Sequence, residues 1–272
     1  MVYMAPPQPG KQTFEGLGRL RIATILAMAV GVVGLLIGLL LISMMGALTG
    51  GDFATVIGIG FTFVAFGIVV FILGLIALIF ALMGIYTLHE GRMEFGNAHA
   101  ASVKKGVNFI VFGMVTYLAA ILSAVFLSVS AVFTFAIDPV ALQNSLLMTA
   151  IVSGALSLVA VVFFGLGMQN LLERLMTARG RGLRMPFLGL AVAGAALALV
   201  LEVVSVFIFN PLALDSTQGL GSLASIVSIV SLYLYFMQLK DAELGARTMI
   251  QTGQFNPDAT GPAPVPVAPP PV

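Results

Sequence analysis

Residues 54–87 read ATVIGIGFTFVAFGIVVFILGLIALIFALMGIYT, and no charged side chain interrupts these 34 residues. A helix rises about 1.5 Å per residue, so roughly 20 apolar residues cross the hydrocarbon core of a bilayer, which is about 30 Å thick. The run is therefore long enough to span a membrane. Because it exceeds the required length, we expect its helix to tilt or to extend past the headgroups.

The rest of the chain repeats this composition. Hydrophobic residues make up 60% of the 272 residues and charged residues only 8%, whereas roughly a quarter of a typical soluble domain is charged. A backbone in lipid must satisfy its own hydrogen bonds, and the apolar blocks lack the alternation of a membrane barrel, so each block predicts a helix. The sequence predicts an all-α integral membrane protein with six transmembrane helices in three hairpins. The predicted spans are about 22–45, 54–87, 107–137, 145–172, 186–209 and 220–239.

The loops between these blocks differ in charge. The loops at 46–55, 138–144 and 210–219 hold no Lys or Arg, and each carries one aspartate: Asp52, Asp138 and Asp215. All 12 Lys and Arg residues lie before the first block or after the second, fourth and sixth. Cytoplasmic loops carry an excess of Lys and Arg. The pattern therefore predicts a cell-membrane protein with both termini in the cytoplasm.

Prolines mark the two ends of the chain. Of 13 prolines, ten lie in the first 18 residues or after residue 256. We expect a disordered N-terminal tail at 1–18, a transmembrane domain at 19–240 and a C-terminal tail at 241–272, Pro-rich from 257. The Pro-rich end is an extended, polyproline-like segment. It is either a solvated tail or a ligand for a proline-binding partner.

Several function classes find no support. The net charge is only +1 and no basic face is concentrated, which excludes a nucleic-acid binder. The absence of Cys excludes disulfides, thiolate metal sites and Cys nucleophiles. The two histidines, His89 and His99, have no established metal-ligand spacing, so we expect a solvated loop there. No phosphate-binding loop, dinucleotide fingerprint or hydrolase motif occurs in a fitting context. We predict no catalytic, cofactor-binding or metal-binding residues, and no enzyme.

Two spans contain seams of small residues. Such seams let helix backbones approach closely in lipid, where no hydrophobic force favours helix over acyl chain. They predict close packing of the first hairpin, with contact between copies of the chain in a homo-oligomer as the alternative. The seams are Ala27, Gly31, Gly34 and Gly38 in the first span and Gly60, Gly67, Gly74 and Ala81 in the second.

Hydroxyl side chains recur in the fourth and sixth spans. Ser145, Thr149, Ser153 and Ser157 are spaced by four residues and share one face of the fourth helix. The row from Ser222 to Ser231 is spaced by three and winds around the sixth helix. Such hydroxyls bond their own backbone or a neighbouring helix, or they line a hydrophilic pathway.

Glu202 is the one acid well inside a predicted span. A charge near the middle of a bilayer costs about 2.5–3.5 kcal/mol on insertion scales, so such a residue usually faces the bundle interior or water. No cation lies in another span to pair with it. Glu202 is therefore either a protonated polar anchor bonded to hydroxyls or a proton or cation site.

Two short stretches resemble a known family. Residues 15–21 read EGLGRLR directly before the first span, and residues 104–107 read KKGV at the start of the third. With the six-span layout, they resemble archaeal multipass membrane proteins grouped as a domain of unknown function. The resemblance implies a prokaryotic cell membrane and brings no catalytic or binding residues.

The spans carry mainly packing features, which favours a structural or assembly role among the functions of a polytopic membrane protein. The alternative is a small-solute or ion permease that uses Glu202 and the hydroxyl face of the fourth span. An intramembrane enzyme is least supported, because no pair of catalytic groups shares a predicted depth. The expected partners are the lipid bilayer, other copies of the chain and a protein that binds the Pro-rich tail.

Overall fold

The computed structural model describes residues 10–49, 53–135, 139–207 and 211–253, and among these residues it contains helices and no strand. Six helices in it are long and apolar enough to cross a membrane. The prediction of an all-α multipass membrane protein is confirmed. In chain order the helices are α1 (Lys11–Thr49), α2 (Phe53–Glu90), the 3-10 turn η1 (Gly91–Met93), α3 (Gly96–Phe135), α4 (Pro139–Leu172), the short α5 (Ala178–Gly182), α6 (Arg184–Phe207) and α7 (Pro211–Gln251).

The six long helices form an arc. Helix α1 packs against α2 and α7, α6 packs against α7 and α4, and α4 packs against α3. The order around the arc is therefore α2, α1, α7, α6, α4, α3. Its two end helices, α2 and α3, touch each other far less than the neighbouring pairs do. Both end helices expose large apolar side chains, among them Phe71, Leu122 and Phe126, as expected for contact with lipid.

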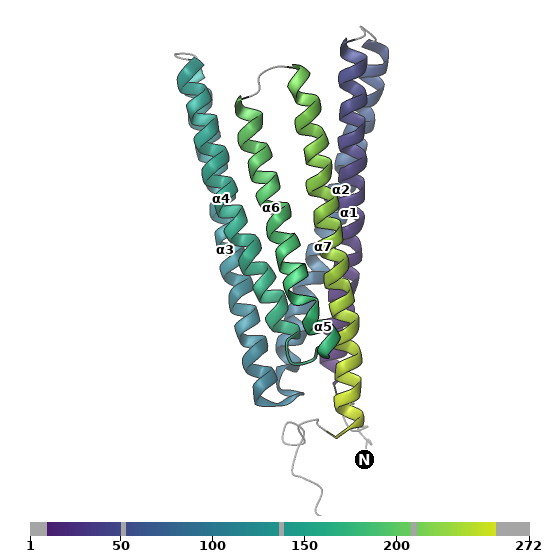
Figure 1. The fold of residues 1–272 in the computed structure, drawn as a ribbon. Coiled ribbons are helices and arrows are strands. Elements are labelled where there is room, and N and C mark those ends of the chain that lie inside the picture. The colour runs from purple at the N-terminus through teal and green to yellow at the C-terminus, as the bar shows by residue number, and fades with distance from the viewer. Residues whose placement is uncertain (1–9, 50–52, 136–138, 208–210, 254–272) are drawn as a thin grey trace, which may run out of the picture.

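The two ends of the molecule differ (Figure 1). We call the end with the α2–α3 and α4–α6 connections the base, and the opposite end the far end. The helices converge at the base and are spread apart toward the far end, where the two hairpins α1–α2 and α3–α4 stand on opposite sides of α6 and α7. The hairpins therefore approach one another most closely at the base.

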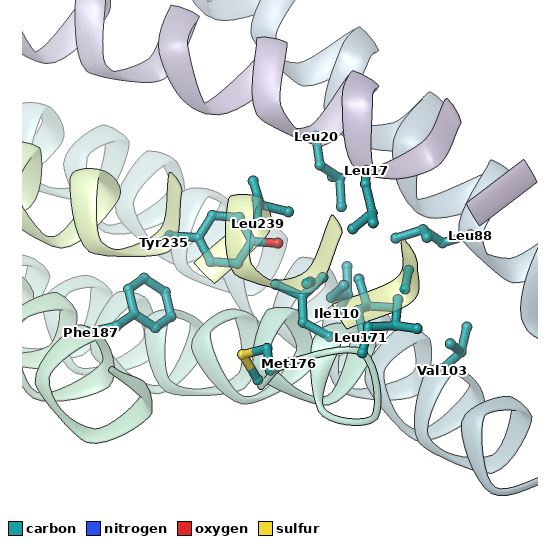
Figure 2. Packing of buried hydrophobic residues seen from close by; sticks show 14 residues of the cluster. Leu17, Leu20, Leu88, Val103, Ile110, Leu171, Met176, Phe187, Tyr235 and Leu239 are labelled. Atoms are coloured by element: carbon teal, nitrogen blue, oxygen red, sulfur yellow. The ribbon is translucent and has the colours of Figure 1, made fainter. Parts of the chain in front are cut away.

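A cluster of buried hydrophobic side chains fills the base (Figure 2). It brings together Leu17 and Leu20 of α1, Leu88 of α2, Ile110 of α3 and Leu171 of α4, with further side chains from α6 and α7. These five residues are at most 4% exposed. Since helices from all three hairpins contribute, this cluster is the common core of the bundle.

A reciprocal glycine contact joins α1 to α2 next to this core. A Cβ placed on Gly16 would lie 3.0 Å from the carbonyl oxygen of Gly84 and 2.7 Å from Cγ of Leu88. Conversely, a Cβ on Gly84 would lie 3.0 Å from the carbonyl oxygen of Gly16 and 2.9 Å from Cγ of Leu20. Each glycine therefore contacts the leucine that lies four residues after the other glycine, and the two helix backbones are in direct contact.

Helices α3 and α4 repeat this contact. A Cβ on Gly106 would lie 2.8 Å from the carbonyl oxygen of Gly167 and 3.1 Å from Cγ of Leu171. A Cβ on Gly167 would lie 2.9 Å from the carbonyl oxygen of Gly106 and 2.6 Å from Cγ1 of Ile110. The first two hairpins therefore share one packing device, in which a glycine and an aliphatic residue four positions later face the same pair on the partner helix.

Two helices extend into the predicted tails of the chain. Helix α1 begins at Lys11, so residues 11–18 are helical and not part of a disordered tail. Helix α7 continues to Gln251, so residues 241–251 are helical as well. The reason is packing at the base: Thr13, Leu17, Ala242 and Ala246 are at most 2% exposed. The remaining tail residues lie outside the described part of the chain.

The small-residue seams do not pack the first hairpin as expected. Cβ atoms added to Gly34, Gly67 and Gly74 would meet nothing within 4 Å, and one added to Gly31 would meet Ile229 of α7. Gly38 and Gly60 lie where the structure describes no side-chain environment. The α1–α2 contact instead depends on the glycines at the base. The spacing of glycines along one helix does not show whether each glycine contacts a neighbouring helix or lies beside open space.

Candidate functional site

A cavity of about 930 Å³ lies between the helices directly beyond the basal core. Ligand sites in proteins commonly have volumes of about 300–1,000 Å³. Five helices line it, and α3 contributes none of the described lining residues. Much of the wall is made of small residues, including Ala27, Gly31 and Gly34 of α1, Ala77 and Ala81 of α2, and Ala191, Gly194 and Ala195 of α6.

The cavity ends at the base on aromatic and aliphatic side chains. The rings of Phe187 and Tyr235 lie 5.4 Å apart and tilted by 32°. Tyr235 donates its hydroxyl hydrogen to Sδ of Met168 over 3.3 Å. Phe187, Tyr235 and Leu20 line the cavity. The same three side chains belong to the basal core (Figure 2). The core therefore closes this end of the cavity.

Hydroxyl groups of α7 and α1 lie in the cavity wall. Ser228 donates to the carbonyl of Ala224 over 2.9 Å, and Thr24 donates to that of Leu20 over 2.8 Å. Ser231 donates to the carbonyl of Phe187 over 3.2 Å and so links α7 to α6. These three hydroxyls already donate their hydrogens to backbone carbonyls. They stabilise the wall and do not offer donors to a solute.

The predicted hydroxyl face of α4 lies elsewhere. Thr149 donates to the carbonyl of Ser145 over 2.8 Å, and Ser153 donates to that of Thr149 over 2.6 Å. Thr149 and Ser153 are each 8% exposed, and Ser145 and Ser157 are half-buried. None of these four residues is among those that line the cavity. Thr149 and Ser153 therefore donate their hydroxyl hydrogens to the backbone of their own helix, α4.

The structure puts Glu202 in α6 next to Leu201, which lines the cavity. The side chain of Glu202 lies outside the described part of the structure. The structure therefore brings its backbone position close to the cavity wall and separates the cavity from the α4 hydroxyls that the sequence grouped with it.

The serine hydroxyls at the cavity belong to the row, spaced by three residues, that winds around the sixth predicted span. Ser225, Ser228 and Ser231 of α7 all belong to the lining. A spacing of three residues winds slowly around a helix, but the cavity is wide enough for α7 to present this arc of its surface. The sequence of a single span does not show how wide the space between the helices is, so it could not predict that these serines line a cavity.

At the base, a carboxylate joins the α2–α3 connection to the start of α1. Glu94 accepts hydrogen bonds from the backbone N–H of Gln12 over 3.1 Å, from that of Thr13 over 3.0 Å, and from the Thr13 hydroxyl over 2.6 Å. The first N–H groups of a helix have no partner within the helix, and the helix dipole favours a negative charge there. Glu94 therefore caps α1 from a distant part of the chain.

A second carboxylate does the same for the α4–α6 connection. Asp241 of α7 accepts from the backbone N–H of Thr177 over 2.8 Å, from the Thr177 hydroxyl over 2.7 Å and from the N–H of Gly180 over 3.1 Å. A Cβ on Gly180 would lie 2.2 Å from Oδ2 of Asp241, and one on Gly245 would lie 1.9 Å from the carbonyl oxygen of Leu175. The connection thus lies directly on the α7 backbone.

A third polar group links α4 to the start of α6. Arg184 donates from Nη1 to Glu173 over 3.1 Å and from Nε to Oε1 of Gln169 over 2.8 Å. Ser102 of α3 donates to Glu173 over 3.2 Å. Burial raises the pKa of Glu173, but the hydrogen bonds from Arg184 and Ser102 and the positive charge of Arg184 together hold it below the ordinary value of 4.5.

The two histidines are not in a solvated loop, contrary to expectation. His99 lies in α3 and is 1% exposed, and its ring meets Phe95 edge-on at 5.7 Å. His89 lies at the end of α2 and is half-buried. Within the described ranges, no three His, Asp or Glu side chains are grouped as metal ligands. The helices continue further into the base than hydropathy indicates, which is why these residues are packed.

All Lys, Arg, Asp and Glu residues whose side chains the structure describes lie at the base. Four ion pairs occur among them, and Arg21 with Glu243 joins α1 to α7 over 3.1 Å. The cavity walls, by contrast, contain no charged residue among those described. The described charged side chains and the open space are therefore separated along the molecule.

Comparison with family models, with curated proteins and with solved structures finds no match to this chain.

Proposed function

We propose that this polytopic membrane protein is non-enzymatic and has a structural or assembly role in the cell membrane. The observation that carries the proposal is the use of its polar groups. At the base, Glu94 and Asp241 cap helices, and Glu15, Glu173 and Glu243 pair with arginines. In the cavity wall, the hydroxyls of Thr24, Ser228 and Ser231 donate to backbone carbonyls. Side chains committed to holding the fold are what a structural membrane protein needs.

The charge distribution supports an orientation with both termini in the cytoplasm. The base carries the described Lys and Arg residues, and the positive-inside rule favours the cytoplasm for that end. The chain has no Cys, so a single cysteine introduced beside Asp52, Asp138 or Asp215 would be the only thiol that a labelling reagent can modify. We expect a membrane-impermeant maleimide to label each of these cysteines in intact cells. Labelling only after permeabilisation would reverse the orientation.

The assembly role is tested by isolating the protein from its native membrane in a mild detergent. Native mass spectrometry should find it in a defined complex, either with copies of itself or with another membrane protein. A version that ends at residue 256 should show whether the Pro-rich end recruits the partner. Recovery of the monomer alone, together with solute flux in proteoliposomes, would replace the structural role by transport.

The second candidate function is a permease for a small solute or ion. The position of Glu202 next to cavity-lining Leu201 favours it. Proteoliposomes containing the wild type and Glu202→Gln should then differ, because an amide keeps the shape of the carboxyl group but cannot release a proton. Loss of flux in a normally folded variant supports transport. Equal flux in both proteins removes Glu202 from the mechanism.

A further inference from the structure

We propose that the cavity between the helices binds a hydrocarbon chain of a bilayer lipid, which enters between α2 and α3. Binding of a lipid chain in the cavity would be a property additional to the structural role proposed above. It depends on the volume of the cavity, the chemistry of its wall and the position of its open side.

The wall chemistry selects an apolar occupant. Alanine, glycine and large apolar residues dominate the lining, and no charged residue is among the described lining residues. Thr24, Ser228 and Ser231 already donate to backbone carbonyls. A buried water needs two to four polar partners, so a cavity of about 930 Å³ with this wall is a poor container for water. A hydrocarbon chain requires no hydrogen bond and fits the same wall.

The protein cannot fill the cavity by itself. A Cβ added to Gly34 would meet nothing within 4 Å, and the neighbouring wall residues Ala27, Ala77 and Ala195 have no side chain long enough to cross the space. Closing the cavity would require the hairpins to move together. The backbone contacts between α1 and α2 and between α3 and α4, with the shared core, fix the hairpins at the base.

The position of the open side identifies the lipid bilayer as the source of the occupant. The arc of helices is least closed between α2 and α3, and the cavity is partly open. Leu78 of α2 lines the cavity and is 50% exposed. The adjoining surfaces carry exposed apolar residues such as Phe71 and Phe126. The medium at this opening is therefore acyl chain, while the aromatic residues at the base close the other end.

The first experiment uses a phospholipid with a photoreactive diazirine in one acyl chain, incorporated into nanodiscs with the full-length protein. Mass spectrometry should find adducts on the α6 segment 191–198 as well as on the outward face near Phe126. In Gly34→Phe the ring occupies the cavity, and we expect the α6 adducts to fall by roughly threefold or more while those near Phe126 persist. Gly67→Phe is the control, because Gly67 also has open space but does not line the cavity.

The second experiment measures water in the cavity. Ala195→Cys would be the only thiol of the chain. We expect it to react slowly with a charged methanethiosulfonate, at least about tenfold more slowly than an exposed cysteine at Lys240, because hydrocarbon excludes the reagent. Rapid reaction would show a water-filled cavity and overturn the proposal. Outward adducts without α6 adducts in the first experiment, or equal α6 adducts in Gly34→Phe and the wild type, would also overturn it.

Discussion

The base and the far half of the molecule are built from the same helices but are held by different contacts. At the base, glycines let backbones touch, carboxylates cap helix ends and leucines form a common core. In the far half, glycines such as Gly34 and Gly67 face open space, and the helices leave a cavity. Glycines can therefore act in opposite ways. Gly16 at the base permits contact between backbones, whereas Gly34 leaves volume beside the cavity.

The largest effect should follow from adding one methyl group at the base. In Gly245→Ala, the new Cβ would lie 1.9 Å from a backbone oxygen of Leu175 that cannot rotate away. We expect the free energy of unfolding to fall by about 3 kcal/mol, the upper part of the range for overpacking. Thermal unfolding in detergent, followed by circular dichroism, measures it, since the chain has no Trp for fluorescence.

The control for that variant is Gly189→Ala in α6, where a Cβ meets nothing within 4 Å. Alanine at an unstrained helical position stabilises by roughly 0.4–1 kcal/mol. The two substitutions are chemically identical and should move the midpoint in opposite directions. If both variants unfold at the same temperature, the close contact between α7 and the α4–α6 connection is wrong.

A smaller loss should follow from separating α3 and α4. In Gly167→Ala, the new methyl group would meet Ile110 at 2.6 Å and the carbonyl oxygen of Gly106 at 2.9 Å. Part of this clash is relieved by rotation of the isoleucine, so we expect a loss of about 2 kcal/mol. Gly67→Ala, in the far half of α2, should lose nothing. Equal stability of the two variants would remove the contrast between the regions.

The carboxylate caps should contribute less than the backbone contacts. Asp241→Ala removes the acceptor for two backbone N–H groups and one hydroxyl. Loss of a helix cap costs about 0.5–2 kcal/mol, and we expect about 1 kcal/mol here. Asp241→Asn keeps one acceptor oxygen and should retain part of the stability. An alanine variant as stable as the wild type would show that the connection does not depend on this cap.

The smallest effect is the pH dependence of the Glu173–Arg184 pair. The pKa of Glu173 in the folded protein is below its ordinary value of 4.5, so the pair stabilises the fold above pH 4.5, and this contribution is lost as the pH falls through the lower folded value. The midpoint difference between wild type and Glu173→Gln should therefore shrink on acidification below pH 4.5. A difference that stays constant down to pH 3 would contradict the lowered pKa.

Hydropathy was sufficient to predict the helical class and the six spans, because a backbone in lipid has few alternatives to a helix. It did not predict where α1 begins or α7 ends. Residues such as Thr13 and Ala246 are helical because of neighbours far away in the sequence, and not because of a local apolar run.

The site was harder to predict than the fold. Four glycines bring together the two helices of each of the first two hairpins, and each precedes a leucine or isoleucine by four residues. In the sequence these pairs are residues 16 and 20, 84 and 88, 106 and 110, and 167 and 171. The pattern is short and meaningful only in pairs on different helices. The cavity could not be predicted, since it depends on the separation of five helices. The side chain of Glu202, the strongest single candidate in the sequence, lies outside the described residues.

The length of the helices has a thermodynamic consequence. Helix α7 has 41 residues and is about 60 Å long, roughly twice the thickness of the hydrocarbon core. Hydrocarbon can cover only about half of this length, and the charged base is the half that we expect in or next to water. There its leucine core would be stabilised as in a soluble protein, with a positive heat capacity of unfolding. The far half, surrounded by acyl chains, lacks this contribution. A single continuous helix thus joins a water-driven folding unit to one that depends on packing in lipid.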